Sequence, residues 1–233
     1  WTVHHPIYSE KKVVDNVSFN VRRGEIVGFS GLQGAGRTEL AMSIFGRSYG
    51  TNISGSLKID GKPAELKTVR SAIEAGLAYV TEDRKGNGLI LEESIAVNTT
   101  MSRLEKVCSK GIINVDKENA VAEDYKNKLH TKTPSVQQAV GNLSGGNQQK
   151  VVLSKWLFTE PDVLILDEPT AGLDPLGVES ILGNIRDYHK AHNATIIMVS
   201  HSMEDVARFV DRLIVMDHGQ VRFDGTPKEV FGH

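Results

Sequence analysis

The chain has 233 residues, of which 39% are hydrophobic and 24% charged, a composition typical of a folded globular protein rather than a disordered one. Lys and Arg number 27 against 29 Asp and Glu, so the formal net charge is -2 and no general basic field predicts a nucleic-acid or anionic-lipid partner. The single cysteine, Cys108, excludes an internal disulfide.

Short β-like runs bounded by Gly or Asp are concentrated in the outer thirds of the chain. We expect strands at residues 13–21, 25–30, 56–60, 77–81, 163–167, 195–200 and 212–216. Several of these runs are continuously apolar, which is typical of central parallel strands covered by helices on both faces. Helical patterns replace them in the middle of the chain, and we expect helices at residues 94–104, 116–129 and 145–158.

This distribution predicts one compact unit with two lobes. The predicted core comprises residues 1–83 and 154–233, and residues 84–153 form an inserted α-helical subdomain. The N-terminal segment lacks the basic and then apolar layout of a signal peptide, and no apolar run approaches the roughly 20 residues that cross a bilayer. We therefore expect a soluble chain with no direct membrane insertion.

A glycine-rich loop follows the strand expected at residues 25–30. Residues 31–38 read Gly-Leu-Gln-Gly-Ala-Gly-Arg-Thr and precede a helical pattern at residues 39–45. The loop matches the phosphate-binding pattern G-x-x-x-x-G-K followed by Ser or Thr, except that Arg37 occupies the lysine position. Gly31, Gly34 and Gly36 allow a tight curl whose N–H groups, with the helix start, bind a polyphosphate. A purely structural turn is the alternative.

Two side chains of this loop carry the expected chemistry. Thr38 is placed to ligate a magnesium ion that is shared with the phosphates. Lysine would supply a compact charge to the outer phosphates, whereas the arginine fork is wide and planar and need not fit the same space. We therefore predict that Arg37 impairs hydrolysis more than nucleotide binding.

Polar side chains also follow two of the predicted strands. Asp167 and Glu168 end the run Val-Leu-Ile-Leu, at the strand end where ligands bind in open α/β folds. Asp167 is the candidate for the magnesium shell, and Glu168 for orienting or deprotonating the water that attacks the terminal phosphate. His201 follows the strand expected at residues 195–200 and is a candidate contact for that phosphate. An acidic turn and a structural histidine are the alternatives.

A second anion-binding pattern opens the helix expected at residues 145–158. Residues 143–149 read Leu-Ser-Gly-Gly-Asn-Gln-Gln, with Ser144 as a candidate N-cap. With the phosphate loop, the acidic strand, the Gly-Leu-Asp loop at residues 172–174 and His201, this order of motifs resembles the nucleotide-binding cassette of ABC transporters over essentially the full length. The resemblance implies an α/β fold: a P-loop ATPase core with a parallel central sheet, an N-terminal antiparallel β layer and the α-helical subdomain.

The resemblance also implies the cofactors, the partners and the binding residues. ATP and Mg²⁺ would bind between two cassettes paired head to tail, and transmembrane permease subunits would hold them in the cytoplasm against the inner face of a bacterial membrane. The metal ligands would be Thr38, Asp167 and Glu82, although Glu82 replaces the usual glutamine, which weakens its assignment. The nucleotide-binding residues would be Tyr8, Gly31, Gln33, Gly34, Ala35, Gly36, Arg37, Thr38, Glu39, Ser144, Gly145, Gly146, Asn147 and Asp174.

Two of these residues have distinct implied roles. Tyr8 precedes Gly31 by 23 residues and would stack on adenine, with a place in the core as its alternative role. Asp174 would join the communication between the two sites of the pair.

Finer details divide the chain between two branches of the family. Residues up to about 169 resemble the second cassette of monosaccharide importer ATPases, in which the loop arginine is usual. Residues from about 170 resemble energy-coupling-factor ATPases of vitamin and cobalt importers. We therefore predict a recombined or engineered chain, with natural divergence as the competing account. Three functions follow: an importer ATPase, a non-catalytic nucleotide-binding module, or a recombinant cassette with no transport role.

Overall fold

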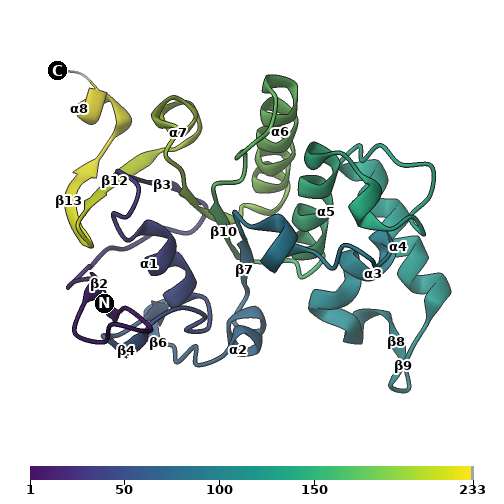
Figure 1. The fold of residues 1–233 in the computed structure, drawn as a ribbon, viewed down its shortest axis with the longest axis horizontal. Coiled ribbons are helices and arrows are strands. Elements are labelled where there is room, and N and C mark those ends of the chain that lie inside the picture. Colours follow the sequence, from purple (N-terminus) through teal and green to yellow (C-terminus); the bar gives the residue numbers. More distant parts are fainter. Residues whose placement is uncertain (232–233) are drawn as a thin grey trace. The chain divides into compact units, whose positions relative to one another are not determined.

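The computed structural model describes residues 1–231, apart from the side chains of residues 203–205 and 231. The chain divides into two compact units (Figure 1). The first comprises residues 1–79, 162–168 and those from 189 onward, and the second comprises residues 80–161 and 169–188. The helical subdomain predicted at residues 84–153 lies within the range of the second unit.

The first unit is built on a six-stranded sheet with the strand order β13-β12-β3-β11-β10-β7 (Figure 1). Its strands are β3 (Ile26–Ser30), β7 (Leu77–Val80), β10 (Val163–Asp167), β11 (Thr195–Val199), β12 (Arg212–Asp217) and β13 (Gln220–Gly225). The β10–β11, β11–β3 and β12–β3 pairs are parallel, which confirms the predicted α/β fold with a parallel core. The prediction needs one correction, because β13 joins the edge antiparallel to β12.

An antiparallel three-stranded sheet forms the predicted N-terminal β layer. Its order is β2-β1-β4, from strands β1 (Thr2–His4), β2 (Lys12–Val14) and β4 (Thr51–Ser54). The strand predicted at residues 13–21 is wrong beyond Val14, because Asn16 adopts a left-handed backbone with φ 52°. The strand predicted at residues 56–60 reduces to β5 (Lys58–Ile59), which pairs with β6 (Lys62–Pro63).

Four short helices accompany the sheets of the first unit: α1 (Arg37–Ile44), α2 (Val69–Glu74), α7 (Met203–Phe209) and α8 (Pro227–Phe231). All five residues of β3 are buried. A Cβ atom at Gly28 would lie 2.6 Å from Val206 Cγ1, so glycine is what allows α7 to pack closely on the centre of β3. The buried sheet therefore brings the ends of β3, β10 and β11 together.

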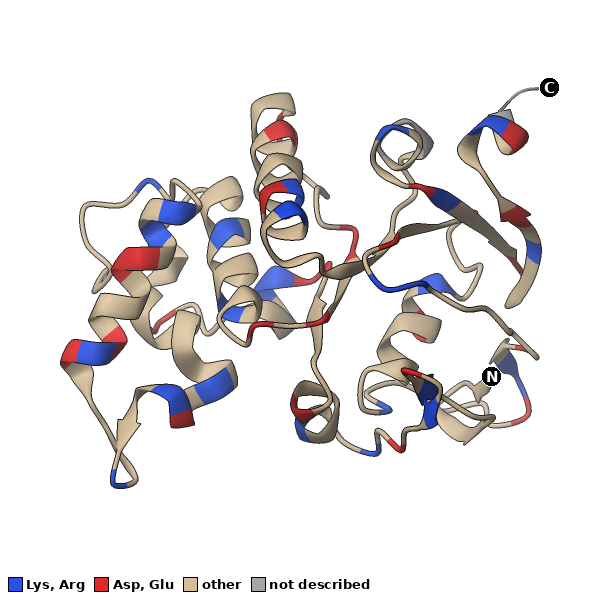
Figure 2. Cartoon of the chain, turned by 180° about the vertical axis from the view of Figure 1, so that it is seen from behind, with Lys and Arg blue, Asp and Glu red and all other residues tan. Residues whose placement is uncertain are grey.

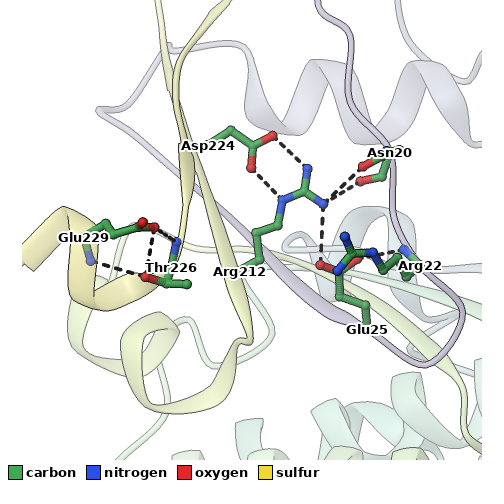
Figure 3. A network of polar contacts seen from close by, with 7 residues as sticks. All are labelled: Asn20, Arg22, Glu25, Arg212, Asp224, Thr226 and Glu229. Atoms are coloured by element: carbon green, nitrogen blue, oxygen red, sulfur yellow. Dashed lines mark hydrogen bonds and ion pairs between the residues drawn. The ribbon is translucent and has the colours of Figure 1, made fainter.

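The pair β12–β13 is held by a polar network at the start of β12 (Figure 3). Arg212 donates two hydrogen bonds to Asp224, at 2.6 and 2.7 Å, and a third to the carbonyl oxygen of Asn20 at 3.0 Å. Glu25 lies 3.4 Å from the same guanidinium and accepts a hydrogen bond from the Arg22 N–H. Asp224 raises the pKa of Arg212, and Arg212 lowers the pKa of Asp224. The network ties the edge hairpin to the segment before β3.

Helices dominate the second unit, as the sequence predicts. They are α3 (Ile95–Thr100), α4 (Val115–Lys128), α5 (Gly145–Leu157) and α6 (Pro175–His192), the last of which ends in the first unit's residue range. A π-helix (Arg84–Gly88), the 3-10 helices Met101–Val107 and Val140–Asn142, and a hairpin of β8 (Cys108–Ser109) and β9 (Ile112–Ile113) complete it. In α4 acidic residues occupy the first turn and lysines the last, as the helix dipole favours (Figure 2).

The predicted helices at residues 116–129 and 145–158 are confirmed to within a residue or two by α4 and α5. The helix predicted at residues 94–104 is too long, because α3 ends at Thr100 and a 3-10 segment follows. The hydroxyls of Thr99 and Thr100 bond back to the carbonyl oxygens of Ile95 and Ala96, a pattern that weakens a helix.

Candidate functional site

The glycine loop connects the buried strand β3 to α1 in the predicted order. Gly36 occupies the N-cap of α1 with φ 92°. A Cβ atom at Gly36 would lie 2.4 Å from the carbonyl oxygen of Val13, so only glycine fits. Gly34 is exposed with φ 80°, and a Cβ atom there would meet nothing within 4 Å. One side of the loop is therefore packed, and the Gly34 side is open.

The other candidate residues of this loop also differ in exposure. Gln33 is exposed, whereas Ala35 is buried and its carbonyl oxygen accepts a hydrogen bond from the Gly219 N–H at 3.0 Å. Glu39 lies half-buried in the first turn of α1, and Gly31 is half-buried at the end of β3. The loop thus has a main-chain anchor on the side of residue 219.

Thr38 and Asp167, two of the residues expected to ligate magnesium from the sequence, lie within hydrogen-bond distance of each other. The Thr38 hydroxyl donates to Asp167 Oδ1 at 3.1 Å. Asp167 ends β10 with only 1% of its surface exposed. A hydroxyl beside a carboxylate fits Mg²⁺, which prefers oxygen ligands and keeps further positions for water and phosphate. Among the side chains that the structure describes, no group of three or more His, Cys, Asp or Glu could hold a metal ion, so a cation bound by these oxygens would need such additional ligands.

Tyr79 is a contact of Asp167 that the sequence analysis missed. Its hydroxyl donates to Asp167 Oδ2 at 2.6 Å, and its side chain is buried. The available signal was the tyrosine near the end of the apolar strand predicted at residues 77–81. That pattern predicted the strand, but it could not show which neighbouring strand would receive the hydroxyl.

Glu168 and His201 form a close pair at the ends of β10 and β11. His201 Nδ1 lies 2.9 Å from Glu168 Oε2, and the main-chain N–H of His201 donates to Glu168 Oε1 at 2.8 Å. The Glu168 side chain is 7% exposed and that of His201 is 69% exposed. Glu168 also adopts a left-handed backbone with φ 46°, a conformation that costs a non-glycine residue energy and is frequent at functional sites.

Arg37 does not extend along the open side of the glycine loop. Its Nη1 donates to the carbonyl oxygen of Ser200 at 2.8 Å and lies 3.8 Å from Glu168 Oε1. The residue is buried, with 8% of its surface exposed. The guanidinium therefore lies against the same strand ends as the Glu168 carboxylate.

Tyr8 lies in a loop between β1 and β2. Its side chain is 58% exposed and its ring centroid is 5.2 Å from that of His5. The alternative role as a core aromatic is therefore wrong, because an exposed ring contributes little to a core.

Four candidate residues of the second unit, 144–147, lie at the start of α5. Ser144 has the N-cap position of α5, but its side chain makes no cap hydrogen bond, which corrects that prediction. Its hydroxyl instead accepts from Asn147 Nδ2 at 2.9 Å. A Cβ atom at Gly146 would meet nothing within 4 Å, whereas one at Gly145 would lie 2.8 Å from the guanidinium of Arg84, a neighbour that the sequence did not predict.

Among the described side chains, neither Asp174 nor Glu82 belongs to a group of His, Cys, Asp or Glu that could hold a metal ion. Asp174 Oδ1 accepts a hydrogen bond from the Gly177 N–H at 3.1 Å, directly before Pro175, the first residue of α6. This is the geometry of a helix cap, which is a structural role. Glu82 is exposed, and its carbonyl oxygen accepts a hydrogen bond from the Arg84 N–H.

Comparison with known sequences agrees with this arrangement. The ABC transporter family model matches residues 14–171. The chain is 51% identical over 224 residues to the L-arabinose transport ATP-binding protein of Geobacillus stearothermophilus, a match that covers 95% of this chain and 43% of that protein. It is 42% identical over 221 residues to the xylose import ATP-binding protein of Thermoanaerobacter pseudethanolicus, again covering 95% and 43%.

The chain thus spans less than half the length of these relatives. The match to the arabinose transport protein covers 95% of the chain and so extends past residue 170, where the branch resemblance was expected to change. A recombined origin is not supported by this match.

Solved structures share the fold. An ATP-binding cassette in a dimeric post-hydrolysis state with ADP and Pi matches with a TM-score of 0.81 at 20% identity, over 97% of this chain and 96% of the other. A part of an ABC transporter complex from Clostridium perfringens matches with a TM-score of 0.77 at 25% identity, over 100% and 90%. Among the described helices, none combines the length and the apolar content that a membrane crossing requires. By its family match and its fold, the chain belongs to the ABC transporter family.

Proposed function

We propose that this chain is an ATP-binding cassette of a sugar importer. The carrying observation is the position of Thr38 against Asp167, 3.1 Å apart, directly after a glycine loop with one open side. In this proposal these side chains supply oxygen ligands for a divalent cation beside N–H groups that bind phosphate. The sugar class is supported by relatives named for the transport of arabinose, xylose and ribose.

The residues of the first unit take the following roles in this proposal. Gly31, Gly34 and Gly36 give the loop the curl in which main-chain N–H groups face the phosphates, flanked by Gln33, Ala35 and Glu39. Thr38 and Asp167 hold Mg²⁺, which neutralises charge on the phosphates when it is bound. Glu168 orients the attacking water with its carboxylate and accepts a proton from it. His201 holds that carboxylate through both Nδ1 and the main-chain N–H.

Arg37 makes hydrolysis slow in this proposal. Its guanidinium donates to Ser200 and lies 3.8 Å from Glu168, so contact with a phosphate requires it to leave two buried polar partners. The same guanidinium lies beside the carboxylate that would orient the attacking water. Binding relies on main-chain N–H groups and on Thr38, whereas the arginine contacts Ser200 and Glu168.

A head-to-tail pair and a membrane partner complete the proposed assembly. A second cassette would present its own Ser144, Gly145, Gly146 and Asn147 to the nucleotide bound here. The open face of Gly146 and the absence of a Ser144 cap bond support this, because both leave main-chain N–H groups at the start of α5 accessible to an anion.

The remaining residues and the location belong to the same assembly. Tyr8, which is exposed, would stack on adenine, Asp174 would contact the partner, and Glu82 would approach the metal. Permease subunits would hold the assembly in the cytoplasm at the inner face of the bacterial membrane. The division into a core of residues 1–83 and 154–233 and a helical subdomain of residues 84–153 stays part of this proposal.

The direct test is calorimetric titration of the chain with ATP and Mg²⁺. We expect saturable binding that Gly34→Asp weakens at least about tenfold, because an added carboxylate repels the phosphates on the open side of the loop. Gly61→Asp is the matched control, since Gly61 also has a positive φ, 75°, and a Cβ atom there would also meet nothing within 4 Å. Absence of heat from the parent chain at saturating ATP, with the fold intact by circular dichroism, contradicts the proposal.

A second candidate function is a nucleotide-binding module that does not hydrolyse ATP, and the ion pair of Arg37 with Glu168 favours it. Glu168→Gln separates the two, because the amide cannot accept the proton of the attacking water. If the parent chain and Glu168→Gln turn over ATP equally slowly while both bind it, the binding module is the correct description. A loss of about a hundredfold in turnover supports the ATPase.

A further inference from the structure

Asp167 is held from two sides by hydroxyl groups. The Thr38 hydroxyl donates to Oδ1 at 3.1 Å, and the Tyr79 hydroxyl donates to Oδ2 at 2.6 Å. Asp167 is 1% exposed and Tyr79 is 6% exposed. A buried carboxylate needs such donors, and an O–H bond to an ionised oxygen at this distance belongs to the strong, charge-assisted class. The carboxylate therefore has one oxygen fixed by Tyr79 and the other directed to Thr38.

The ring of Tyr79 is itself held in place. Tyr79 lies in β7, the neighbour of β10 in the sheet, and it stacks on Phe45 with ring centroids 5.6 Å apart and an interplanar angle of 23°. Phe45 is the C-cap of α1, the helix whose first turn carries Thr38. One short helix thus supplies the hydroxyl that faces Oδ1 and the ring that fixes the donor to Oδ2.

We propose that Tyr79 is a positioning residue for the metal-binding carboxylate of Asp167. By occupying Oδ2, its hydroxyl sets the rotation of the carboxylate so that Oδ1 stays beside the Thr38 hydroxyl, where a cation needs it. Groups that orient a metal ligand change metal affinity about 10- to 100-fold when removed. The inference deepens the proposed function and rests on it, since it concerns the magnesium-dependent part of nucleotide binding.

The test compares Tyr79→Phe with the parent chain, using a fluorescent ATP analogue as the probe. Affinity is measured first in EDTA and then as a function of Mg²⁺ concentration. We expect the affinity in EDTA to stay within about twofold, while the Mg²⁺ concentration for half-maximal enhancement rises about tenfold. Phenylalanine keeps the stacked ring and loses the hydroxyl, so the change removes the hydrogen bond to Asp167.

Tyr188→Phe is the matched control, because the Tyr188 hydroxyl also donates to a buried partner, in this case the carbonyl oxygen of Pro161 at 3.2 Å. It should leave the Mg²⁺ dependence unchanged. A purely structural role for Tyr79 predicts that nucleotide affinity falls by the same factor in EDTA and in Mg²⁺. That result overturns the inference, and so does an unchanged Mg²⁺ dependence of the affinity. If the parent chain binds no nucleotide in EDTA or in Mg²⁺, the proposed function fails instead.

A second variant keeps the test decisive if Tyr79→Phe does not fold. Phe45→Leu preserves the Tyr79 hydroxyl but removes the ring that it stacks on. We expect this variant to raise the Mg²⁺ concentration for half-maximal enhancement by a smaller factor, about threefold. Its nucleotide affinity in EDTA should change little. An unaltered Mg²⁺ dependence in a folded Phe45→Leu chain counts against the positioning role.

Discussion

His201 contacts Glu168 with two different groups, its main-chain N–H to Oε1 at 2.8 Å and its ring Nδ1 near Oε2 at 2.9 Å. The exposed histidine therefore restrains a carboxylate that is almost completely buried. Because alanine keeps the main-chain N–H at position 201, the ring contact can be removed by itself.

Replacing His201 by alanine is expected to lower ATP turnover by about tenfold or more, because the Glu168 carboxylate loses the ring that orients it. ATP affinity should change by less than about twofold, since neither group belongs to the glycine loop. His218→Ala is the control, as that ring also lies beside a carboxylate, Asp217, at 2.7 Å and is exposed. Steady-state phosphate release checks the result, and equal turnover in all three chains contradicts the role of the ring.

Arg37→Lys is expected to raise turnover by about tenfold, because an ammonium group presents a compact charge and forms a weaker contact with Ser200 and Glu168 than the guanidinium fork does. Arg23→Lys, at an exposed site paired with Asp60, is the control and should have no effect. Single-turnover kinetics distinguish a faster chemical step from tighter binding. Lower turnover in Arg37→Lys would mean that the loop is adapted to arginine and that hydrolysis is not impaired by it.

Lys155 should make the free energy of unfolding depend on pH in the alkaline range. Burial lowers the pKa of Lys155 from 10.5 to about 8, so between these values the unfolded chain holds a proton that the folded chain has released. Raising the pH through this window therefore favours the folded state, by at most roughly 3 kcal/mol from this group. In Lys155→Met this contribution disappears.

The measurement is urea unfolding at pH 8 and pH 10 for the parent chain and for Lys155→Met. The free energy of unfolding of the parent should rise relative to the variant between the two pH values. Lys128→Met is the control, because Lys128 is exposed and paired with Asp124. A constant difference between the parent and Lys155→Met would show that the buried amine keeps its proton throughout.

Arg212→Lys is expected to lower the free energy of unfolding by about 1–2 kcal/mol, because lysine cannot reproduce the two parallel hydrogen bonds to Asp224 while also reaching Asn20. Arg23→Lys serves again as the control. Arg23 contacts both carboxylate oxygens of Asp60 at an exposed site, so this contact should contribute less than about 0.5 kcal/mol to the free energy of unfolding. Thermal and urea midpoints check the result. Equal shifts in the two variants would show that the additional contacts of Arg212 add nothing to the free energy of unfolding.

Local patterns in the sequence were enough to predict the elements that carry the site. The run Val-Leu-Ile-Leu before Asp167 predicted a buried parallel strand, and the strand is β10 with the same bounds. The spacing of the glycines predicted the loop before α1, since a positive φ at Gly34 and Gly36 is what glycine allows. Where patterns were ambiguous the predictions failed, as at Asn16, whose left-handed backbone ends a strand that its neighbours would continue.

Because parallel strand ends meet at one edge of a sheet, the sequence by itself determined that Thr38, Asp167, Glu168 and His201 would lie in one region. Only the tertiary structure decided which groups touch. Tyr79 and Asp167 are 88 residues apart, and Arg37 and Ser200 are 163 apart, yet each pair is hydrogen-bonded. Such contacts depend on strand order and side-chain direction, which residue patterns along the chain do not encode.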